Sequence, residues 1–594
     1  MNTFPLIKAK WSNEHIMAAV FLTLVLYHLP LWMENPARII YFILLTAFGL
    51  LIDAIASMLR HHRLWCCVSG AITAAMISLL SVNAPLWGQL LGVAFALIVG
   101  KHLQGGTGKN IVNPAMAGLI ILLPLFGYPR VFFEASWWLL PAIMLSLAFL
   151  AIRPYAGIGF ILGMLAAMYL NQELAFANMI TYGVFFWGCL VMTDPVTVTS
   201  RPAVGGVMGL LAGALPLYIF KTPAAVVLGV LIVNLFSEDI AKLLYKADRK
   251  GKAKVRIPKV FPHIDSKTEM IDLTGNEETS LEKAQYDHLT KEVILDRIRK
   301  NDVFGMGGAA FSTYRKIMTV LEGEGTDKHL IINGVECDPG LIHDAWLLRN
   351  HFTEIVKGVE LLRKCVEFQS SYLAVKDKSG LSGSDLIEIV QVQDLYPVGA
   401  ERILIDAVLG KGLHNDQIPA KEGILVLNVQ TIYAISRAVL INKPVESRYL
   451  TVASLKEKTA KVVKVKLGMK LQEVMEAVYP DTVNIFAGGG IMQAYLAEED
   501  AVVDKSINFI AAGIIPDYKE SPQCSNCKTC VKNCPSGLQV KQIADLVDLG
   551  KLEETSKYHA KDCISCGSCS YSCLAGNNLA AKVRTAKEAS VADK

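Results

Sequence analysis

The fold of the C-terminal part of the chain is decided by two segments, Cys524-Ser-Asn-Cys-Lys-Thr-Cys-Val-Lys-Asn-Cys534-Pro535 and Cys563-Ile-Ser-Cys-Gly-Ser-Cys-Ser-Tyr-Ser-Cys573. Each has the spacing C-x2-C-x2-C-x3-C, in which three thiolates bind one iron–sulfur cube and the fourth reaches elsewhere. Disulfide frameworks are typical of small secreted domains, and zinc sites usually end in histidine or use separated cysteine pairs. The spacing therefore predicts two [4Fe–4S] clusters.

The two segments also resemble two-cluster ferredoxins, in which the fourth cysteine of each motif ligates the cluster of the other motif. This resemblance implies crossed ligand sets and two clusters that lie close together. One set is Cys524, Cys527, Cys530 and Cys573, and the other is Cys534, Cys563, Cys566 and Cys569.

The remaining sequence divides into an apolar and a polar half. Of the 594 residues, 52% are hydrophobic and only 19% are charged, which is too apolar for a wholly soluble protein. The excess lies within residues 16–245, where many apolar stretches approach the roughly 20 residues that span a bilayer. We predict ten spans, at residues 16–33, 39–59, 66–82, 86–101, 112–127, 136–152, 156–170, 179–193, 204–220 and 223–244.

Basic residues between the spans predict the orientation, because Lys and Arg concentrate in short cytoplasmic loops. With the N-terminus inside, six fall in inner loops and three in outer loops. The inner ones are Arg60, Arg63, Lys101, Lys109, Arg153 and Arg201, and the outer ones are Arg38, Arg130 and Lys221. We expect a multi-pass protein of the cytoplasmic (inner) membrane with its C-terminal half in the cytoplasm. The net charge of +4 and the basic cluster after Tyr245 fit a membrane surface and give no nucleic-acid signal.

Two polar stretches rich in helix breakers interrupt the apolar half, at residues 104–114 and 192–202. Non-helical backbone at membrane depth survives only where it lines a cavity or is buried by protein. Paired interruptions indicate an internal repeat around a central site, although two ordinary inner loops are the alternative. Asp53 is a further candidate, since an ionisable group within a span is costly. The candidate residues of the breaks are Asn110, Asn113, Pro114, Thr193, Asp194, Pro195 and Thr197.

The segments GGTGKNIVNPAMAG (105–118) and MTDPVT (192–197) resemble, in order and spacing, the RnfD/NqrB family of membrane subunits. Those subunits have an inverted-repeat helical fold and couple electron flow to ion movement, so the resemblance implies a redox membrane protein. The family commonly carries FMN on the last threonine of a Ser/Thr-Gly-Ala-Thr motif. The nearest string here, Ser69-Gly-Ala-Ile-Thr73, has an extra residue. Covalent FMN is therefore not expected, and a noncovalent flavin or a quinone stays open.

The polar half has a mixed α/β pattern with two segments of interest. Gly305-Met-Gly-Gly-Ala-Ala-Phe-Ser-Thr-Tyr-Arg-Lys316 is a glycine-rich loop that opens a helix, where backbone amides can approach a phosphate. His329-Leu-Ile-Ile-Asn-Gly-Val-Glu-Cys-Asp-Pro-Gly340 is typical of a buried strand that ends in an acidic turn. Open α/β sheets bind their ligands at such strand ends.

Together with YPVGAERILI (396–405) and LNVQTIYAI (427–435), these segments resemble RnfC and, more distantly, the flavoprotein subunit of complex I. In those proteins the glycine loop binds the FMN phosphate, NADH binds beside the flavin, and electrons pass to nearby [4Fe–4S] clusters. The resemblance implies that FMN and NAD(H) bind here, with Glu336 and Asp338 as catalytic candidates. The implied cofactor contacts are Gly305, Gly307, Gly308, Ala309, Phe311, Lys316, Glu336, Asp338 and Pro339.

The expected fold is multidomain. Its parts are a polytopic α-helical membrane domain of the inverted-repeat type (1–247), a basic linker and connecting segment (248–290), a Rossmann-like α/β FMN/NADH domain (291–440), an SLBB-like β-grasp domain (441–513) and a two-cluster ferredoxin-like domain (514–594). We expect a membrane-bound subunit that passes electrons from NADH through FMN and two clusters to a membrane acceptor or ferredoxin.

The sequence leaves open the direction of electron flow and its coupling to Na⁺ or H⁺. One alternative is reverse flow from ferredoxin or quinol to NAD⁺, and the other is a redox-sensing transporter without NADH turnover. The expected partners are other membrane and electron-carrier subunits of an Rnf-like complex, together with ferredoxin or quinone.

Overall fold

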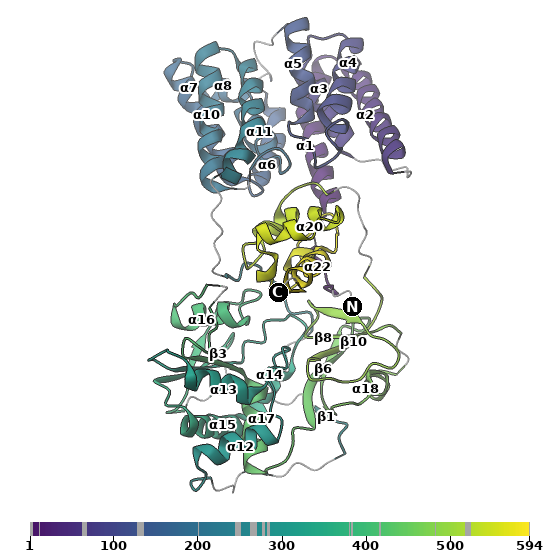
Figure 1. The fold of residues 1–594 in the computed structure, drawn as a ribbon. Helices are drawn as coiled ribbons and strands as arrows, with labels where there is room; N and C mark the ends of the chain where they lie inside the picture. The colour runs from purple at the N-terminus through teal and green to yellow at the C-terminus, as the bar shows by residue number, and fades with distance from the viewer. Residues whose placement is uncertain are drawn as a thin grey trace.

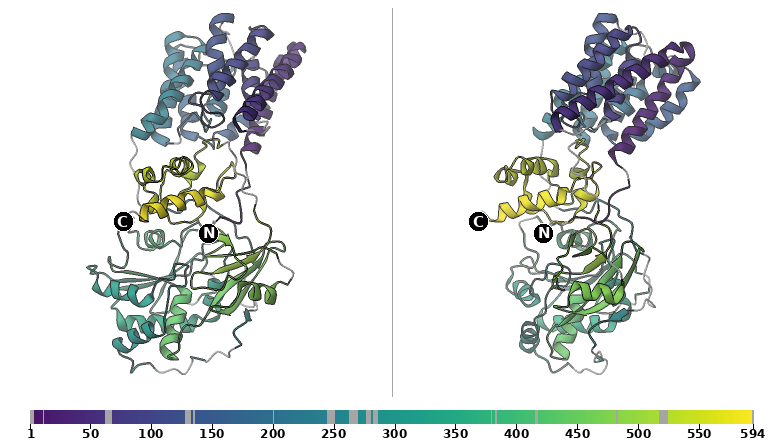
Figure 2. Two further views of the ribbon diagram at one scale, coloured as in Figure 1. Left: turned by 45° about the vertical axis from the view of Figure 1, so that its right-hand side comes forward. Right: turned by 90° about the vertical axis from the view of Figure 1, so that its right-hand side faces the viewer.

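The structure, a computed structural model, has three layers (Figure 1). A helical half (residues 13–243) lies at one end, a parallel-sheet domain (286–440) and a mixed-sheet domain (447–512) lie at the other, and a cysteine domain (524–592) lies between them. Figure 2 shows the same order from two further sides. Of the basic cluster after Tyr245, Lys252 is described, whereas Lys246, Arg249 and Lys250 lie outside the described residues. These residues are 4–10, 12–61, 68–127, 133, 136–199, 201–243, 251–261, 270–275, 280–281, 286–378, 380–381, 384–414, 417–480, 483–516 and 524–592.

Helix is present in each of the ten predicted spans. The first group of helices is α1 (Asn13–Glu34), α2 (Ala37–His61), α3 (Val68–Leu80), α4 (Leu86–Leu97), the π turn η1 (Ile98–His102) and α5 (Pro114–Phe126). The second group is η2 (Trp137–Leu139), α6 (Leu140–Phe149), α7 (Pro154–Leu170), α8 (Phe176–Thr181), α9 (Val184–Phe186), the π turn η3 (Trp187–Val191), α10 (Pro202–Phe220), η4 (Pro223–Ala225) and α11 (Val226–Leu243). By length and composition, three of the described helices can cross a membrane, namely α1, α2 and α10, and six shorter apolar helices accompany them.

Large apolar side chains are exposed on the outer faces of these helices. Trp137 and Trp138, at the start of the α6 segment, are also exposed, as is common for tryptophans at a membrane–water interface. Such faces suit lipid rather than water. Examples of the exposed side chains are Ile40, Leu44, Leu51, Leu162, Leu211 and Ile219.

Glycines bring α7 and α10 into close contact. A Cβ at Gly159 or Gly163 of α7 would lie 2.4 and 2.2 Å from backbone oxygens of α10. A Cβ at Gly209 or Gly213 of α10 would lie 2.4 Å from backbone oxygens of α7. Small residues allow this approach, which is a common source of helix association in membranes.

Both predicted breaks have the same construction. Each preceding helix ends in a π turn, η1 or η3, and each following helix begins with proline, Pro114 or Pro202. Proline suits this position because its missing N–H would have no partner there and its φ is already helical. The Asn113 side chain caps α5 by accepting from the Ala115 amide at 3.0 Å. The breaks are therefore built into the helical half.

The parallel-sheet domain has the strand order β4-β3-β2-β5, with all pairs parallel. Because the strands are parallel, their carboxyl ends meet at one edge of the sheet. The strands are β2 (His329–Asn333), β3 (Ser370–Val375), β4 (Glu388–Gln391) and β5 (Ile424–Asn428). The helices are α12 (Lys291–Lys300), α13 (Thr313–Glu322), α14 (His343–Asn350), α15 (Phe352–Cys365), α16 (Glu401–Leu409) and α17 (Val429–Leu440).

The mixed-sheet domain is built on a six-stranded sheet with the order β1-β7-β6-β10-β8-β9. The edge strand β1 (Met270–Asp272) comes from the predicted linker and pairs in parallel with β7. The segment expected to be only a connection therefore contributes to the sheet. The other elements are β6 (Ser447–Ser454), β7 (Thr459–Lys466), α18 (Leu471–Val478), β8 (Ile485–Gly488), β9 (Ala494–Leu496) and β10 (Phe509–Ala512).

The cysteine domain consists of short helices packed around buried cysteines and apolar side chains. The N-terminal segment before α1 runs along it. Phe4 pairs with Ala494 at the edge of the mixed sheet, and the Ala9 amide donates to the Tyr571 carbonyl at 3.0 Å. The helices are α19 (Thr529–Lys532), α20 (Val540–Asp548), η5 (Glu553–Tyr558), η6 (Ala560–Asp562), α21 (Ser568–Tyr571) and α22 (Leu579–Ala592).

Candidate functional site

The glycine-rich loop lies beside the carboxyl end of β5. Phe304 and Ser312 form a bridge that closes the loop, and the Met306 amide donates to the Thr431 hydroxyl of α17 at 2.9 Å. Gly308 has a φ of +105°, which a side chain would strain. The loop backbone is thus held at the sheet edge where α/β proteins bind ligands.

Packing within the protein does not explain why glycine, rather than a larger residue, stands at the first positions of this loop. A Cβ at Gly305 or Gly307 would come no closer than 3.4 Å to another atom, whereas one at Gly334 or Gly340 would come within 2.9 or 2.7 Å. Open space beside a loop backbone is what binding of a phosphate by amides requires. The loop therefore fits the phosphate of FMN.

The other predicted FMN contacts of this region lie on the same loop or beside it. Ala309 is exposed, and the Phe311 ring is 54% exposed. The Lys316 ammonium donates to the Val426 carbonyl at 2.8 Å and pairs with Glu401 at 2.7 Å. These contacts hold its positive charge at the end of β5.

The acidic turn contains a buried glutamate with an unusual backbone. Glu336 has a φ of +43°, a conformation that is uncommon outside glycine, and it is only 7% exposed. Its carboxylate accepts from the Asp344 amide at 2.9 Å and lies 3.4 Å from the Lys259 ammonium. These contacts hold the strained backbone conformation of Glu336 in place, as is common at functional sites.

Asp338 and Pro339 connect the acidic turn to neighbouring segments. The Asp338 carboxylate accepts from the amides of Ile491 and Met492 in the mixed-sheet domain, at 3.0 and 3.1 Å. The Pro339 carbonyl accepts from the Val260 amide at 3.0 Å. Asp338 therefore uses its oxygens to join two domains at the site.

Sequence reasoning missed a second buried carboxylate, Asp344. Burial and the neighbouring Glu336 raise its pKa to about 8, and its Oδ2 accepts from the Asn428 amide at 2.6 Å. Its Oδ1 has no hydrogen-bond partner among the described residues. The adjacent imidazole of His343 has a pKa lowered to about 3 by burial. The only signal in the sequence was the His-Asp pair after the acidic turn.

Arg448 was also missed, and it joins the glycine loop to the mixed sheet. Its guanidinium is 1% exposed and donates to the carbonyls of Lys505 and Met306, at 2.8 and 3.3 Å, and to the Asn508 side chain. A buried cation held by this many acceptors fixes the position of the loop. Its role depends on contacts distant in sequence, so no local sequence pattern predicts it.

The two cysteine motifs lie beside each other in the cysteine domain, and the neighbours of Cys530 and Cys569 include cysteines of both motifs. Burial and the neighbouring thiols of Cys527, Cys524 and Cys573 raise the pKa of Cys530 well above its usual value. For Cys569, the same effect comes from burial and then from a set that includes Cys566, Cys563 and Cys534. Cys573 thus lies with the first motif and Cys534 with the second. Thiols crowded in this way suit a positively charged metal centre that stabilises thiolates.

No three His, Cys, Asp or Glu side chains of the described residues lie close enough together to hold one metal ion. A [4Fe–4S] cluster differs in this respect, because each thiolate binds a separate iron at a corner of a cube. The arrangement of the cysteines fits the clusters, and their ligation stays a prediction.

The two sets lie against opposite neighbours. At the set containing Cys534 and Cys566, the Tyr396 hydroxyl of the parallel-sheet domain donates to the Cys566 carbonyl at 2.6 Å. At the set containing Cys527, the Arg153 guanidinium of the helical half donates to the Cys527 carbonyl at 2.8 Å. The cysteine domain therefore touches both neighbours at its ligand loops.

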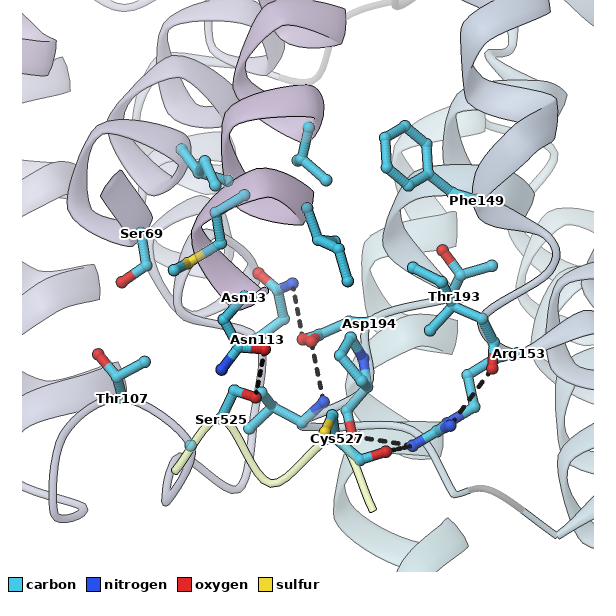
Figure 3. A pocket seen from close by; sticks show the side chains of 18 of the residues that line it. Asn13, Ser69, Thr107, Asn113, Phe149, Arg153, Thr193, Asp194, Ser525 and Cys527 are labelled. Atoms are coloured by element: carbon cyan, nitrogen blue, oxygen red, sulfur yellow. Dashed lines mark hydrogen bonds between the residues drawn. The ribbon is translucent and has the colours of Figure 1, made fainter. Parts of the chain in front are cut away.

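A cavity of about 360 Å³ lies where the helical half meets the cysteine domain (Figure 3). It is lined by both breaks, by α1 and α3, and by the loop that carries Cys527. The predicted residues Asn110, Asn113, Pro114, Thr193, Asp194 and Pro195 line it. Ser69 and Thr73, the ends of the string closest to the covalent-FMN motif, line it as well.

Polar contacts connect the two breaks. The Asn113 side chain lies 3.5 Å from Asp194, whose carboxylate also accepts from Thr197 at 2.7 Å. Asn234 of α11 accepts from the Asn113 amide at 2.9 Å and donates to the Thr197 carbonyl at 3.4 Å. The structure thus brings the predicted residues of both breaks into one site.

Asp53, the further candidate for the membrane site, has a charged partner and is not among the residues that line the cavity. It is buried in an ion pair with Lys101, at 2.7 Å, and its other oxygen contacts His102 at 2.7 Å. Lys101 also donates to Ser69 at 2.6 Å and does line the cavity. Asp53 therefore compensates the charge of a cavity lysine.

Comparison with known proteins gives two family matches. Residues 1–141 match the NQR2, RnfD, RnfE family. Residues 298–437 match the Nuo51 FMN-binding domain.

Curated relatives match about half of the chain, and each is named as a subunit of an oxidoreductase complex. The relative from the ion-translocating oxidoreductase complex of Pasteurella multocida is 30% identical over an alignment of 292 positions, which covers 46% of this chain and 34% of the relative. The relative from the Na(+)-translocating ferredoxin:NAD(+) oxidoreductase complex of Acetobacterium woodii is 26% identical over 51% of this chain and 71% of the relative. The chain thus spans about a third of the length of the Pasteurella relative.

A crystal structure of an NAD+-reducing [NiFe]-hydrogenase in the H2-reduced state covers 50% of this chain and 60% of that chain, at 16% identity and a TM-score of 0.37. At that score we draw nothing from the similarity. The family matches confirm the predicted arrangement of one chain that has an NQR2, RnfD, RnfE-type segment in its N-terminal part and a Nuo51-type FMN-binding domain in its C-terminal part.

Proposed function

We propose that this chain is an electron-transfer subunit of an ion-translocating oxidoreductase complex in the cytoplasmic membrane, with its C-terminal half in the cytoplasm. It takes electrons from NADH at the parallel-sheet domain and delivers them to an acceptor at the cavity of the helical half. The family matches and the names of the relatives support this proposal. The other members of the complex are its expected partners.

The parallel-sheet domain would hold FMN and the nicotinamide. Amides of the glycine loop at Gly307 and Gly308 bind the phosphate, with the Lys316 charge nearby. The Gly305 amide donates to the Phe311 carbonyl at 2.8 Å and so holds the loop closed. Glu336 and Asp344 stand at the adjacent strand end, where burial and the neighbouring Glu336 raise the pKa of Asp344. When bound, FMN supplies the exchange between two-electron hydride chemistry and single electrons, which [4Fe–4S] clusters carry.

The observation that carries the proposal is the placement of the cysteine domain. Tyr396 of the parallel-sheet domain binds the Cys566 loop, and Arg153 of the helical half binds the Cys527 loop. With one predicted cluster at each contact, the chain can carry electrons between the parallel-sheet domain and the helical half. A sensor would need only one cluster, so the arrangement favours conduction.

The cavity is the proposed site of the membrane acceptor. At about 360 Å³ it lies within the size range of small-molecule sites, and its lining is mainly apolar with a few polar groups from the breaks. A noncovalent flavin or a quinone has the required chemistry. The covalent attachment common in the family is not proposed, since the Ser/Thr-Gly-Ala-Thr motif is absent from the sequence.

Reverse flow is the second candidate, in which a reduced carrier such as ferredoxin feeds NAD⁺ reduction. The name of the Acetobacterium woodii relative favours it, because that protein belongs to a ferredoxin:NAD(+) oxidoreductase complex. The same sites would serve both directions.

The test is an anaerobic titration of the purified full-length protein with NADH, followed by low-temperature electron paramagnetic resonance. Dithionite reduction of the same sample is the control for cluster content. Cluster signals produced by NADH would support input at the parallel-sheet domain. If dithionite produces the signals and NADH does not, NADH input is wrong and reduced ferredoxin becomes the donor to test next.

A further inference from the structure

Arg153 is a buried cation at the contact between the helical half and the cysteine domain. It stands at the start of α7 and is 7% exposed. Its guanidinium donates to the carbonyls of Pro195 and Val198 in the second break, at 3.2 and 3.4 Å, and to the Cys527 carbonyl at 2.8 Å. One side chain therefore ties a cavity wall to a loop that carries a predicted cluster ligand.

The same side chain lines the cavity. Arg153, Asp194 and Cys527 are all cavity residues, and Figure 3 shows Arg153 between the break and the cysteine loop. Arginine suits this task because its guanidinium is always charged and its planar fork can serve several acceptors at once. Lysine would offer a point charge without that geometry.

The charge of Arg153 acts on any cluster that the nearby cysteines hold. Four thiolates give a [4Fe–4S] centre net negative charge, and reduction adds one more. A buried cation stabilises the reduced form more than the oxidised form, because Coulomb energy is large where water is excluded. Net charge, hydrogen bonds and exposure are the factors that set cluster potentials.

On this basis we propose that Arg153 is a positioning residue that docks the Cys527 loop on the cavity and raises the reduction potential of the cluster held by Cys524, Cys527, Cys530 and Cys573. The inference rests on the proposed function, since it requires that cluster to be present.

The chain offers a matched control at the other set. The Lys254 ammonium donates to the Cys534 carbonyl at 2.8 Å, and Lys254 comes from the soluble half rather than the helical half. A second control is Ser525, whose hydroxyl donates to Asn13 of α1 at 3.1 Å across the same contact as Arg153. Removing Ser525 weakens docking without changing the charge.

The experiment is a potentiometric titration of both clusters in the full-length protein, followed by electron paramagnetic resonance. The variants are R153M, R153Q, K254M and S525A, and C527S identifies the signal of the first set. We expect R153M to lower the potential of the first cluster and leave the second unchanged, and K254M to do the reverse. S525A should move neither potential.

The outcomes separate the inference from the proposed function. If the unaltered protein shows no cluster signals with dithionite, the proposed function fails. If it shows two clusters and R153M leaves both potentials unchanged or lowers both equally, the role of Arg153 is refuted. R153Q keeps one N–H donor for the Cys527 carbonyl and removes the charge, so it decides the question if R153M does not fold.

Discussion

The contact between the first break and the cysteine domain can be opened by one methyl group. Gly108 has a φ of +82°, and a Cβ there would lie 1.7 Å from the Cys524 carbonyl oxygen. Ordinary contact begins at about 3.4 Å, so Gly108→Ala must displace the cysteine loop by roughly 1.7 Å. The left-handed backbone adds about 1–2 kcal/mol of strain for alanine.

A displacement of this size breaks the other contacts of the loop. The Arg153–Cys527 hydrogen bond involves a charged donor and contributes about 1.5–3 kcal/mol. The neutral Ser525–Asn13 bond contributes about 0.5–1.5 kcal/mol. Losing both lowers the ratio of docked to undocked molecules by a factor on the order of a hundred.

Hydrogen–deuterium exchange with mass spectrometry measures this opening without any assumption about function. We expect faster exchange in Gly108→Ala for peptides covering residues 103–113 and 524–533. Gly127→Ala is the matched control, because Gly127 has a φ of +93° with nothing among the described residues within 4 Å of a Cβ. If exchange at 524–533 is unchanged in Gly108→Ala, or equally increased in Gly127→Ala, the proposed contact is wrong.

Three further predictions concern the C-terminal half. Gly307→Ala should leave thermal stability within about 1 kcal/mol of the unaltered protein, since a Cβ there meets only ordinary contacts, but it should lower the FMN content measured after purification. Unchanged FMN content would contradict the glycine-loop site. Asp344 has a folded pKa of about 8, above its unfolded value of 3.8, so stability falls as pH rises through that window, with a slope of at most about 1.4 kcal/mol per pH unit. In melting curves from pH 4 to 9, Asp344→Asn should lack this fall, and parallel curves would refute the assignment. Finally, Cys573→Ser should remove the same paramagnetic signal as Cys524→Ser, and Cys534→Ser should remove the other one. If Cys534→Ser removes the same signal as Cys524→Ser, the ligation is uncrossed.

The sequence predicted those parts of the molecule that depend on local spacing. The cysteine motifs, the two breaks and the glycine loop each carry their information within about a dozen residues. The family matches confirm the kinds of segment that were expected. Asp53 shows the limit of this reasoning, because burial predicts that it needs a partner, but only the fold shows that Lys101 is that partner and faces the cavity.

What the sequence could not predict lies between domains. Arg153 and Cys527 are 374 residues apart, and Arg448 reaches the loop at Met306 from a different sheet. Asp344 directly follows the acidic turn, yet its raised pKa comes from burial and from Glu336. Such contacts and pKa shifts arise when segments distant in sequence pack together and exclude water. A local sequence pattern does not predict them.

The contacts between the helical half and the cysteine domain include hydrogen bonds from Arg153 and Ser525, one from the Asn13 amide to the Leu574 carbonyl at 3.0 Å, and a close approach at Gly108. Two separate proteins would gain little from so few contacts, because association costs several kcal/mol in lost freedom. Here both surfaces belong to one chain, and the segment before α1 pairs with the mixed sheet at Phe4. This tether raises the effective concentration of the two surfaces, so that less freedom is lost when they dock. Joining both halves in one polypeptide therefore allows a contact that is fixed in place yet easily perturbed. That is why a single methyl group at Gly108 should be enough to open it.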